Sequence, residues 1–362
     1  MNRNILNMKP SGIRRFTALA KATPGCSMLT IGEPDFDTPE PIRSAAAAAM
    51  AAGLTHYAPN KGTDSLRKAI AAYETARGME CTMENILVTV GATGALNTAL
   101  TGLLNPGDEC IIPIPAFPLY ESITVAAGAV PVFLDLKKTG FQITKEALEA
   151  VISPKTKAIV LNSPNNPTGN SLCSSEIVKV IENFQGLVML DEAYIDFSSQ
   201  DSFCSLLDKY PNLVIFQTFS KAWASAGLRL GMAFASPEII AVYNKVKYPY
   251  NVNLQTQQLM LAHLQEPQRI QAWVAELIEQ RSFLQQALAA LPIVQHIYPS
   301  DANFLLVKVD DADALYQYLV AQGIIVRNRN RVRLCEGCLR ITVGTADENA
   351  ALMAAMQQFI NL

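Results

Sequence analysis

Short apolar runs recur along much of the chain, separated by polar segments that contain glycine or proline. They lie at residues 86–90, 109–113, 130–134, 158–161, 187–190, 213–217 and 232–235. The runs are rich in Val, Ile and Leu, and turn-forming residues bound them, which is typical of strands buried on both faces of a sheet. We therefore expect them to form a largely parallel β-sheet.

Helical segments fall between several of these runs. Residues 144–152 and 174–183 have helical patterns, and an alanine-rich helix is expected between Ser44 and Gly53. Strands that alternate with helices form β-α-β units with right-handed crossovers. The sequence thus predicts an α/β fold with a large, doubly wound, mostly parallel sheet domain at residues 45–250.

The pattern changes after Asn251. A long helical pattern extends from residue 254 to residue 291 and ends before Pro292. Strands at 303–309, 323–327 and 339–342 then alternate with helices at 312–322 and 346–359. We expect a smaller α+β domain at residues 251–362, with the polar, proline-containing segment 1–44 packed against it.

Composition and charge argue against several classes of function. The net charge is −3, only 17% of the 362 residues are charged, and no block of Lys or Arg is present, so we expect no nucleic-acid partner. No apolar run approaches the roughly 18–20 residues that span a bilayer. Residues 1–10 have no apolar signal-peptide core. We expect a cytoplasmic protein without membrane contact.

The sequence gives little support for a metal site or for the catalytic triad of a hydrolase. The seven cysteines are an odd number spread over a long chain, which indicates reduced thiols. Cys335 and Cys338 form a C-x-x-C pair, but without a second pair or a histidine at zinc spacing we interpret them as two packed side chains. Only three histidines are present, so we expect neither a metal site nor a Ser-His-Asp triad.

Polar patterns follow four predicted strands, where an open α/β sheet binds ligands. VGATG at 90–94 opens a helix whose first N–H groups can hold a phosphate, although a plain helix start has the same pattern. SPNNPTG at 163–169 is a rigid turn with several side-chain amides. DEAY at 191–194 brings an acid to the tip of an apolar strand, where its burial is costly unless a cation meets it.

The fourth pattern contains Lys221. TFSK at 218–221 follows an apolar strand, and GLRLG at 227–231 comes shortly after it. A lysine between such segments is placed for partial burial, which lowers the pKa of the amine and makes it nucleophilic. Taken alone, this lysine is also explained as an ordinary surface residue.

Taken together in this order, these patterns resemble the fold-type-I pyridoxal-phosphate enzymes, specifically the class I/II aminotransferases. NNPTG, DEAY and S-K-x5-G-x-R-x-G form a specific combination, and the resemblance covers nearly the whole chain. It implies pyridoxal 5'-phosphate as cofactor, with an amino donor and a 2-oxo acid as substrates. The residue types suit this chemistry, because a lysine amine can hold an aldehyde and a carboxylate can keep a pyridine nitrogen protonated.

The resemblance implies a role for each of several residues. Lys221 would hold the cofactor as a Schiff base and move a proton between the substrate α-carbon and the cofactor. Asp191 would pair with the pyridinium nitrogen. Tyr194 and Asn166 would hydrogen-bond the 3′-oxygen of the cofactor, and the Asn166-Pro167 bond is expected to be cis.

Further positions would bind the cofactor or the substrate. Phe117, where the family usually has tyrosine or tryptophan, would stack on the cofactor ring. Tyr57 would reach the phosphate of a neighbouring subunit, which implies a homodimer with shared active sites; the alternative is an interface aromatic. Gly32 would lie at the substrate carboxylate, which Arg340 would grip unless it forms a strand-end ion pair instead. The phosphate ligands would be Ala92, Thr93, Ser220 and Arg229.

The two halves of the chain resemble different aminotransferases. Residues up to about 185, including SGIRRF at 11–16 and IGEPDFDTP at 31–39, resemble the aspartate/aromatic subgroup. Residues from about 188 onward, including GIIVR at 323–327, resemble histidinol-phosphate aminotransferase, in which the position of Arg327 helps bind the substrate phosphate. The N-terminal tyrosine of that family has no match near Ser11. We expect histidinol phosphate as donor, with aspartate or an aromatic amino acid as the alternative.

Two other classes have less support. A nicotinamide dehydrogenase needs a G-x-G-x-x-G fingerprint and an acid roughly 20 residues further on, and the sequence has neither. A non-catalytic regulator of the same fold is expected to lose Lys221 or Asp191, and both are present.

Overall fold

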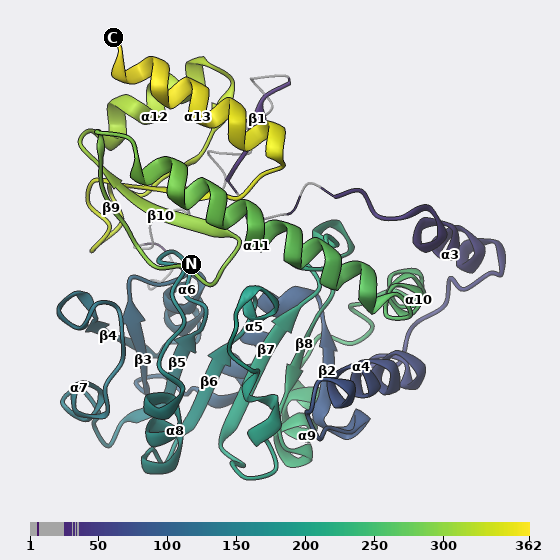
Figure 1. Cartoon of the computed structure of the whole chain (residues 1–362). Helices are drawn as coiled ribbons and strands as arrows, with labels where there is room; N and C mark the ends of the chain where they lie inside the picture. The colour runs from purple at the N-terminus through teal and green to yellow at the C-terminus, as the bar shows by residue number, and fades with distance from the viewer. Residues whose placement is uncertain (1–5, 7–24, 31, 33, 35) are drawn as a thin grey trace.

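A seven-stranded sheet forms the lower part of the molecule in Figure 1. The computed structural model describes residue 6 and residues 25–30, 32, 34 and 36–362. The strand order is β2-β8-β7-β6-β5-β3-β4. The strands are β2 (Ile86–Thr89), β3 (Glu109–Ile114), β4 (Val130–Asp135), β5 (Thr156–Asn162), β6 (Leu187–Asp191), β7 (Leu213–Thr218) and β8 (Gly231–Phe234). In this sheet β8 runs opposite to the other six strands, which are parallel to one another, so the predicted mostly parallel sheet is confirmed.

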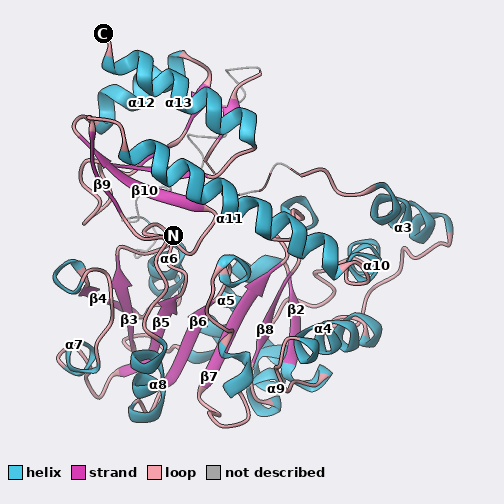
Figure 2. Ribbon diagram, viewed as in Figure 1, coloured by secondary structure: helices cyan, strands magenta, loops and turns pink. Residues whose placement is uncertain are grey.

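Helices connect and cover these strands (Figure 2). They are α3 (Glu40–Ala51), α4 (Asp64–Ala76), α5 (Gly91–Leu103), α6 (Leu119–Ala126), α7 (Lys145–Glu149), α8 (Ser174–Asn183) and α9 (Pro237–Val246). Short 3₁₀ turns lie at η1 (Met83–Asn85), η2 (Lys137–Thr139), η3 (Ile195–Phe197), η4 (Phe203–Leu206) and η5 (Ala226–Leu228). Alternation of strand and helix produces the α/β architecture that the sequence predicts.

The C-terminal third adds a four-stranded sheet with the order β12-β13-β10-β9, whose neighbouring pairs are all antiparallel. Its strands are β9 (Val294–Ile297), β10 (Phe304–Val309), β12 (Arg327–Asn328) and β13 (Cys338–Thr342). The helices are α10 (Leu254–His263), α11 (Pro267–Ala289), α12 (Ala312–Ala321) and α13 (Ala346–Ile360). Separately, β1 (Ser27–Met28) pairs in parallel with β11 (Ile324–Ile325).

Two hydrophobic cores support these two parts. The larger one contains the buried strands of the seven-stranded sheet, and the smaller one lies between the four-stranded sheet and helices α11, α12 and α13. Helix α11 contributes to both, because Leu277 belongs to the larger core and Leu284 and Leu288 belong to the smaller. Figure 1 shows this long helix running across the top of the large sheet.

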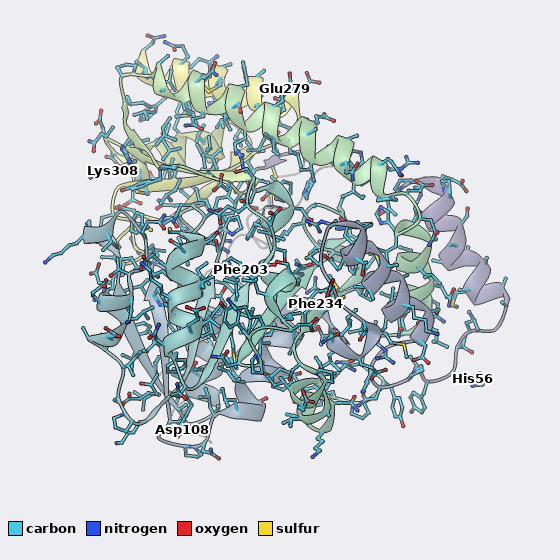
Figure 3. The ribbon with its side chains drawn as sticks, turned by 60° about the horizontal axis from the view of Figure 1, so that its bottom comes forward. His56, Asp108, Phe203, Phe234, Glu279 and Lys308 are labelled. Atoms are coloured by element: carbon cyan, nitrogen blue, oxygen red, sulfur yellow. The ribbon has the colours of Figure 1, made fainter. Side chains whose placement is uncertain are left out.

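Side chains fill the space between the layers (Figure 3). Phe234, at the end of β8, is fully buried there, whereas Asp108 lies at the lower edge of the view and Lys308 at its left edge. Within the part of the chain that the structure describes, no helix combines the length and the apolar character needed to cross a membrane.

Three expected elements differ in the structure. The helix expected at 254–291 is wrong as one element: it is two helices, because Pro267 has no N–H to continue α10 and instead occupies the first turn of α11. The strand expected at 323–327 is divided into β11 and β12, which pair in different sheets. The helix expected to start at Ser44 starts at Glu40, with Pro41 in its first turn.

Candidate active site

The candidate site lies at the carboxyl ends of β5, β6 and β7. Asn162 and Asp191 are cross-strand neighbours at the ends of β5 and β6, and β7 ends at Thr218, three residues before Lys221. The apolar residues of each strand are buried and fix its register, so the polar residue that follows each strand emerges at the same edge.

Asp191 is buried and held in one orientation. Its Oδ2 accepts a hydrogen bond from the Tyr120 hydroxyl at 2.7 Å, and its Oδ1 accepts one from the Ala193 N–H at 3.0 Å. Burial raises the pKa of Asp191, although the Tyr120 hydrogen bond, the Ala193 N–H and the charge of Lys221 act in the opposite direction. Lys221 therefore supplies a cation that acts on the buried acid.

Lys221 and Tyr194 lie together beside this acid. The Lys221 Nζ is 5.5 Å from the centroid of the Tyr194 ring, which is a cation–π distance. Tyr194 is buried and packs edge-on against Phe304 of β10, with ring centroids 5.2 Å apart. The amine is thus placed where the large sheet meets the four-stranded sheet.

Asn166 connects the site to Arg340. Its backbone N–H donates to the Asn162 Oδ1 at 2.7 Å, and its side-chain Oδ1 accepts a hydrogen bond from the Arg340 Nη1 at 2.8 Å. Because this oxygen is engaged by the arginine, the Asn166 Nδ2 remains as a donor. The Asn166-Pro167 bond is cis, as expected.

Backbone N–H groups at the start of α5 lie close to the side chain of Arg229. The helix begins at Gly91 after Val90, which provides no side-chain cap, so Ala92 and Thr93 present first-turn N–H groups. The Arg229 Nη1 donates to the Ala226 carbonyl at 2.8 Å and lies 3.5 Å from the Ser220 Oγ. A Cβ on Gly91 would lie 2.8 Å from the Arg229 Nη2, so glycine permits this close approach. Arg229 itself has a φ of +54°, a left-handed conformation that non-glycine residues rarely adopt.

Phe117 and Tyr57 occupy contrasting environments. Phe117 is partly buried and packs edge-on against Tyr120, with ring centroids 5.7 Å apart. Tyr57, in the segment between α3 and α4, is 82% exposed and stacks on Tyr250 at 4.4 Å. Within this single chain Tyr57 is therefore a surface residue.

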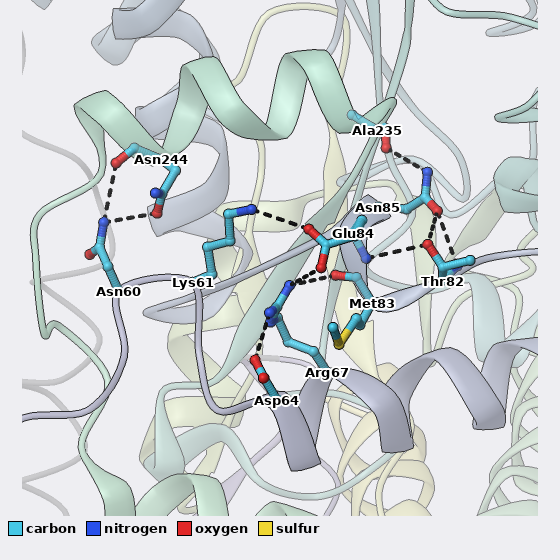
Figure 4. Close-up of polar contacts among 10 residues, drawn as sticks. All are labelled: Asn60, Lys61, Asp64, Arg67, Thr82, Met83, Glu84, Asn85, Ala235 and Asn244. Atoms are coloured by element: carbon cyan, nitrogen blue, oxygen red, sulfur yellow. Dashed lines mark hydrogen bonds and ion pairs between the residues drawn. The ribbon is translucent and has the colours of Figure 1, made fainter.

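Polar contacts anchor the segment that follows Tyr57 (Figure 4). The Asn60 amide donates to the Asn244 carbonyl at 3.1 Å and to its side-chain oxygen at 2.8 Å. Lys61 pairs with Glu84 at 3.3 Å, and Arg67 donates to the Met83 carbonyl at 2.7 Å. The start of α4 is thereby attached to α9 and to the turn before β2.

Two of the predicted substrate residues are buried arginines on neighbouring strands. Arg327 of β12 and Arg340 of β13 are direct cross-strand partners. The Arg340 Nη2 donates to the Thr30 carbonyl, and its guanidinium carbon lies 4.5 Å from the Phe304 ring centroid. Burial lowers the pKa of both arginines, and the charge of Arg340 lowers that of Arg327 further. Among the described residues, Arg340 forms hydrogen bonds rather than the strand-end ion pair that was the alternative.

Gly32 lies beside these groups. Its N–H donates to the Thr342 Oγ1 at 3.1 Å, and its carbonyl accepts from Asn303 at 2.8 Å. The φ of Gly32 is +69°, and a Cβ added there would lie only 3.2 Å from the Asn303 Oδ1, so the position favours glycine. The 11–16 motif and residues 31, 33 and 35 of the 31–39 motif lie outside the described residues.

Sequence reasoning missed two residues at this site. Tyr120 follows Phe117 by three positions, but its contact with Asp191 joins positions 71 residues apart, and only folding reveals it. Arg329 follows Arg327 by two positions, so alternation along a strand could have placed both side chains on one face. Neither received a role from the sequence.

The two cysteines of the C-x-x-C pair are packed among apolar side chains. Cys335 and Cys338 are buried with Leu306 in a small cluster, and burial raises the pKa of both thiols, to about 12 and about 11. Across the described ranges, no three His, Cys, Asp or Glu residues come together as a metal-binding group.

The fold and this arrangement of strand-end residues define an aminotransferase. Residues 25–356 match the family model described as aminotransferase class I and II, and the chain belongs to that family. A protein of Bacteroides fragilis named histidinol-phosphate aminotransferase is 49% identical over 76% of this chain and 80% of its own length. One of the same name from Flavobacterium johnsoniae is 40% identical over 89% and 91%. A solved structure of a Thermus thermophilus aspartate aminotransferase double mutant has a TM-score of 0.86 and 29% identity, covering 100% of this chain and 99% of its own.

Proposed function

We propose that this chain is a pyridoxal-phosphate-dependent histidinol-phosphate aminotransferase that transfers the amino group of histidinol phosphate to 2-oxoglutarate. The observation that carries the substrate is the buried cross-strand pair Arg327 and Arg340. Histidinol phosphate has a dianionic phosphate and no α-carboxylate, whereas 2-oxoglutarate has two carboxylates. A site that serves both needs neighbouring cations that accept either kind of anion. The names of the two relatives support the same substrate.

The residues at the site fit pyridoxal 5'-phosphate. The uncapped start of α5, the Ser220 hydroxyl and the Arg229 guanidinium form a cradle suited to a phosphate. The buried Asp191 carboxylate provides an anion suited to a protonated pyridine nitrogen. When bound, the cofactor supplies an aldehyde carbon that bonds to an amine and a ring that accepts electrons from the substrate α-carbon.

The residues of the chain then act as follows. Asp191 keeps a proton on the ring nitrogen, and the hydrogen bonds from Tyr120 and Ala193 fix its carboxylate. Once the substrate amine had displaced it from the cofactor, the Lys221 Nζ would take a proton from the substrate α-carbon and pass it to the cofactor, and it would reverse this transfer with the 2-oxo acid. Asn166 and Tyr194 would hold the 3′-oxygen of the cofactor through hydrogen bonds, and Phe117 would cover its ring.

In this proposal the two arginines bind different anionic groups of the substrates. Arg340 is fixed by Asn166 and Thr30, and its remaining N–H groups bind the α-carboxylate of the 2-oxo acid. Arg327, on the next strand, binds the phosphate of histidinol phosphate or the distal carboxylate of the acceptor. Held at both carboxylates, the 2-oxo acid presents its reacting carbon to Lys221 in a fixed orientation, and the phosphate contact with Arg327 orients the donor in the same site.

The working form in this proposal is a homodimer with shared sites. Tyr57 and Tyr250 form an exposed aromatic pair, a feature that is enriched at interfaces, and the contacts of Figure 4 hold the adjacent backbone in place. The Tyr57 hydroxyl would then bind the cofactor phosphate of the second subunit.

A second candidate is an aspartate or aromatic amino-acid aminotransferase. It is favoured by the close structural similarity to the Thermus enzyme over the whole chain. A non-catalytic protein of the same fold is disfavoured because both Lys221 and Asp191 are present at the site.

Donor kinetics test the proposal. We expect kcat/KM with 2-oxoglutarate to be highest for histidinol phosphate and lower for tyrosine and aspartate. Arg327→Ala should lower the histidinol phosphate value by about 30-fold or more, as expected when a buried charge pair loses roughly 2–5 kcal/mol, and change the tyrosine value much less. Arg333→Ala, which removes an exposed arginine of the same segment, is the control. A wild type that uses tyrosine or aspartate and ignores histidinol phosphate would favour the second candidate.

A further inference from the structure

Three arginines share one face of the four-stranded sheet. Arg327 and Arg340 are cross-strand partners. Arg329 lies two residues beyond Arg327, and its N–H donates at 2.9 Å to the carbonyl of Cys338, which is two residues before Arg340. Side chains alternate along a strand, so Arg329 lies on the same face as the other two. The residues between them, including Leu339, face the smaller hydrophobic core on the other side.

Arg329 is buried without a counter-charge among the described residues. It is only 9% exposed, and its guanidinium forms no hydrogen bond or ion pair with any residue that the structure describes. Burial and the charges of Arg340 and Arg327 lower its pKa far below the ordinary value for arginine. An uncompensated buried cation is costly to the fold, so packing alone does not explain this residue.

The position of Arg329 suits an anion shared with Arg327. Two residues along a strand span roughly 6.8 Å, a separation that two long arginine side chains bridge around one phosphate. Arg340 is already held by Asn166 and Thr30 on the side nearer the Asp191 site. Arg329 directly follows β12 and lies beside Cys338, two residues away from Arg340 along the neighbouring strand.

We propose that Arg329 is a second ligand of the donor phosphate and, together with Arg327, selects donors that carry a phosphate monoester. This inference rests on the function proposed above for the identity of the donor. A dianion takes hydrogen bonds from both guanidinium groups, whereas a donor without the phosphate gives Arg329 no counter-charge. Arg329 thereby determines specificity by favouring the phosphate and by penalising its absence.

Two donors that differ only in the phosphate test this role. We expect Arg329→Gln to lower kcat/KM for histidinol phosphate by at least about 30-fold and that for histidinol by less than about threefold. Arg329→Lys should recover part of the loss, because it restores the charge without the planar fork. Arg333→Gln, at an exposed arginine in the same segment, should leave both values unchanged. An equal loss for both donors, or no loss for either, would overturn the proposal.

Binding of inorganic phosphate separates this inference from the proposed function. Calorimetric titration of the cofactor-loaded protein at pH 7, with the cofactor's own phosphate site filled, should show phosphate binding at least about tenfold weaker in Arg329→Gln than in the wild type. If the wild type does not use histidinol phosphate but the variant still loses phosphate affinity, the anion site stands and only the donor is wrong. Equal phosphate affinity in both proteins would contradict the anion site itself. The thermal midpoint without ligand should not fall in Arg329→Gln, because no side-chain contact described within the chain is lost; a clear fall would indicate a structural role.

Discussion

At the residue scale, opposing effects act on the pKa of Asp191. Burial favours its neutral form, while the Tyr120 hydroxyl, the Ala193 N–H and the charge of Lys221 favour its anion. The proposed function needs the anion, because only a carboxylate keeps the proton on the ring nitrogen. The Tyr120 hydroxyl is therefore expected to matter for rate although it touches neither the cofactor nor the substrate in the proposed arrangement.

Tyr120→Phe tests this dependence. Loss of the 2.7 Å hydrogen bond should raise the pKa of Asp191 and lower kcat by about tenfold, which corresponds to about 1.4 kcal/mol, with little change in cofactor affinity. Asp191→Asn should lower kcat much further and also retain the cofactor. Tyr210→Phe, which removes a hydroxyl bonded to Glu182 at 2.6 Å, is the matched control. Near-normal kcat in both site variants would mean that the acid is structural.

Individual residues differ in how far the sequence identifies them. Lys221, Asp191, Asn166 and Arg340 stand in local motifs, and the structure brings Lys221 close to Asp191 and Arg340 close to Asn166. Tyr120 contacts an acid on another strand, and Arg329 shares one face of a sheet with two other arginines, so both depend on an arrangement that only the fold creates. A motif records neighbours along the chain, so it carries no signal for such contacts.

At the scale of elements, the segment from α3 to α4 lies at the side of the molecule (Figure 1), and Tyr57 within it is 82% exposed. Helix α3 packs on α10 and the start of α4 is tied to Asn244 and Glu84, so the connecting segment is fixed at both ends. An exposed aromatic on a fixed segment suits contact with a second subunit.

Tyr57→Phe should weaken cofactor binding without preventing dimer formation. The change removes one hydroxyl from the proposed phosphate site of the partner and keeps the aromatic ring. Cofactor affinity by absorbance titration and mass by light scattering are the two measurements. Tyr248→Phe, at another exposed tyrosine, should leave both unchanged. A monomeric wild type at working concentration would exclude shared active sites.

Local sequence patterns predict the presence of an element better than they predict its boundaries. The buried strands of the large sheet were predictable because their apolar runs need no further information. The division of residues 323–327 into β11 and β12 depends on pairing with β1 and β13, which are distant in the chain. The break between α10 and α11 was signalled by Pro267, whose missing N–H ends the helical hydrogen bonding.

At the scale of the whole molecule, a buried acidic cluster joins α4 to the end of β6 and to η3. Glu74 is buried beside Arg77, Asp196 and Glu192, and its Oε2 accepts no hydrogen bond from the described residues. Burial, the largest cause, raises the pKa of Glu74 to about 8. The folded protein therefore binds a proton here that the unfolded chain releases.

This cluster gives a pH dependence of stability. The pKa of Glu74 is higher in the folded protein than in the unfolded chain, so its protonation adds to the free energy of unfolding. This stabilisation is fully present below about pH 4.5 and is lost as the pH rises through about 8. Wild type should lose up to about 1.4 kcal/mol of unfolding free energy per pH unit in this window relative to Glu74→Gln. Urea unfolding at pH 5 and pH 8 measures the difference, with exposed Glu80→Gln as control. Parallel profiles for wild type and Glu74→Gln would contradict the raised pKa.

The site as a whole lies where the two cores meet, with Lys221 and Asp191 on the large sheet and the arginines on the four-stranded sheet. The central claim is that Lys221 holds the cofactor. Borohydride reduction of the cofactor-loaded protein, followed by peptide mapping, should place the cofactor on Lys221 in the wild type and in Lys61→Ala. Lys221→Ala should carry no label and no activity while unfolding at the wild-type temperature. Label on Lys61 or Lys245, or turnover by Lys221→Ala, would contradict the account.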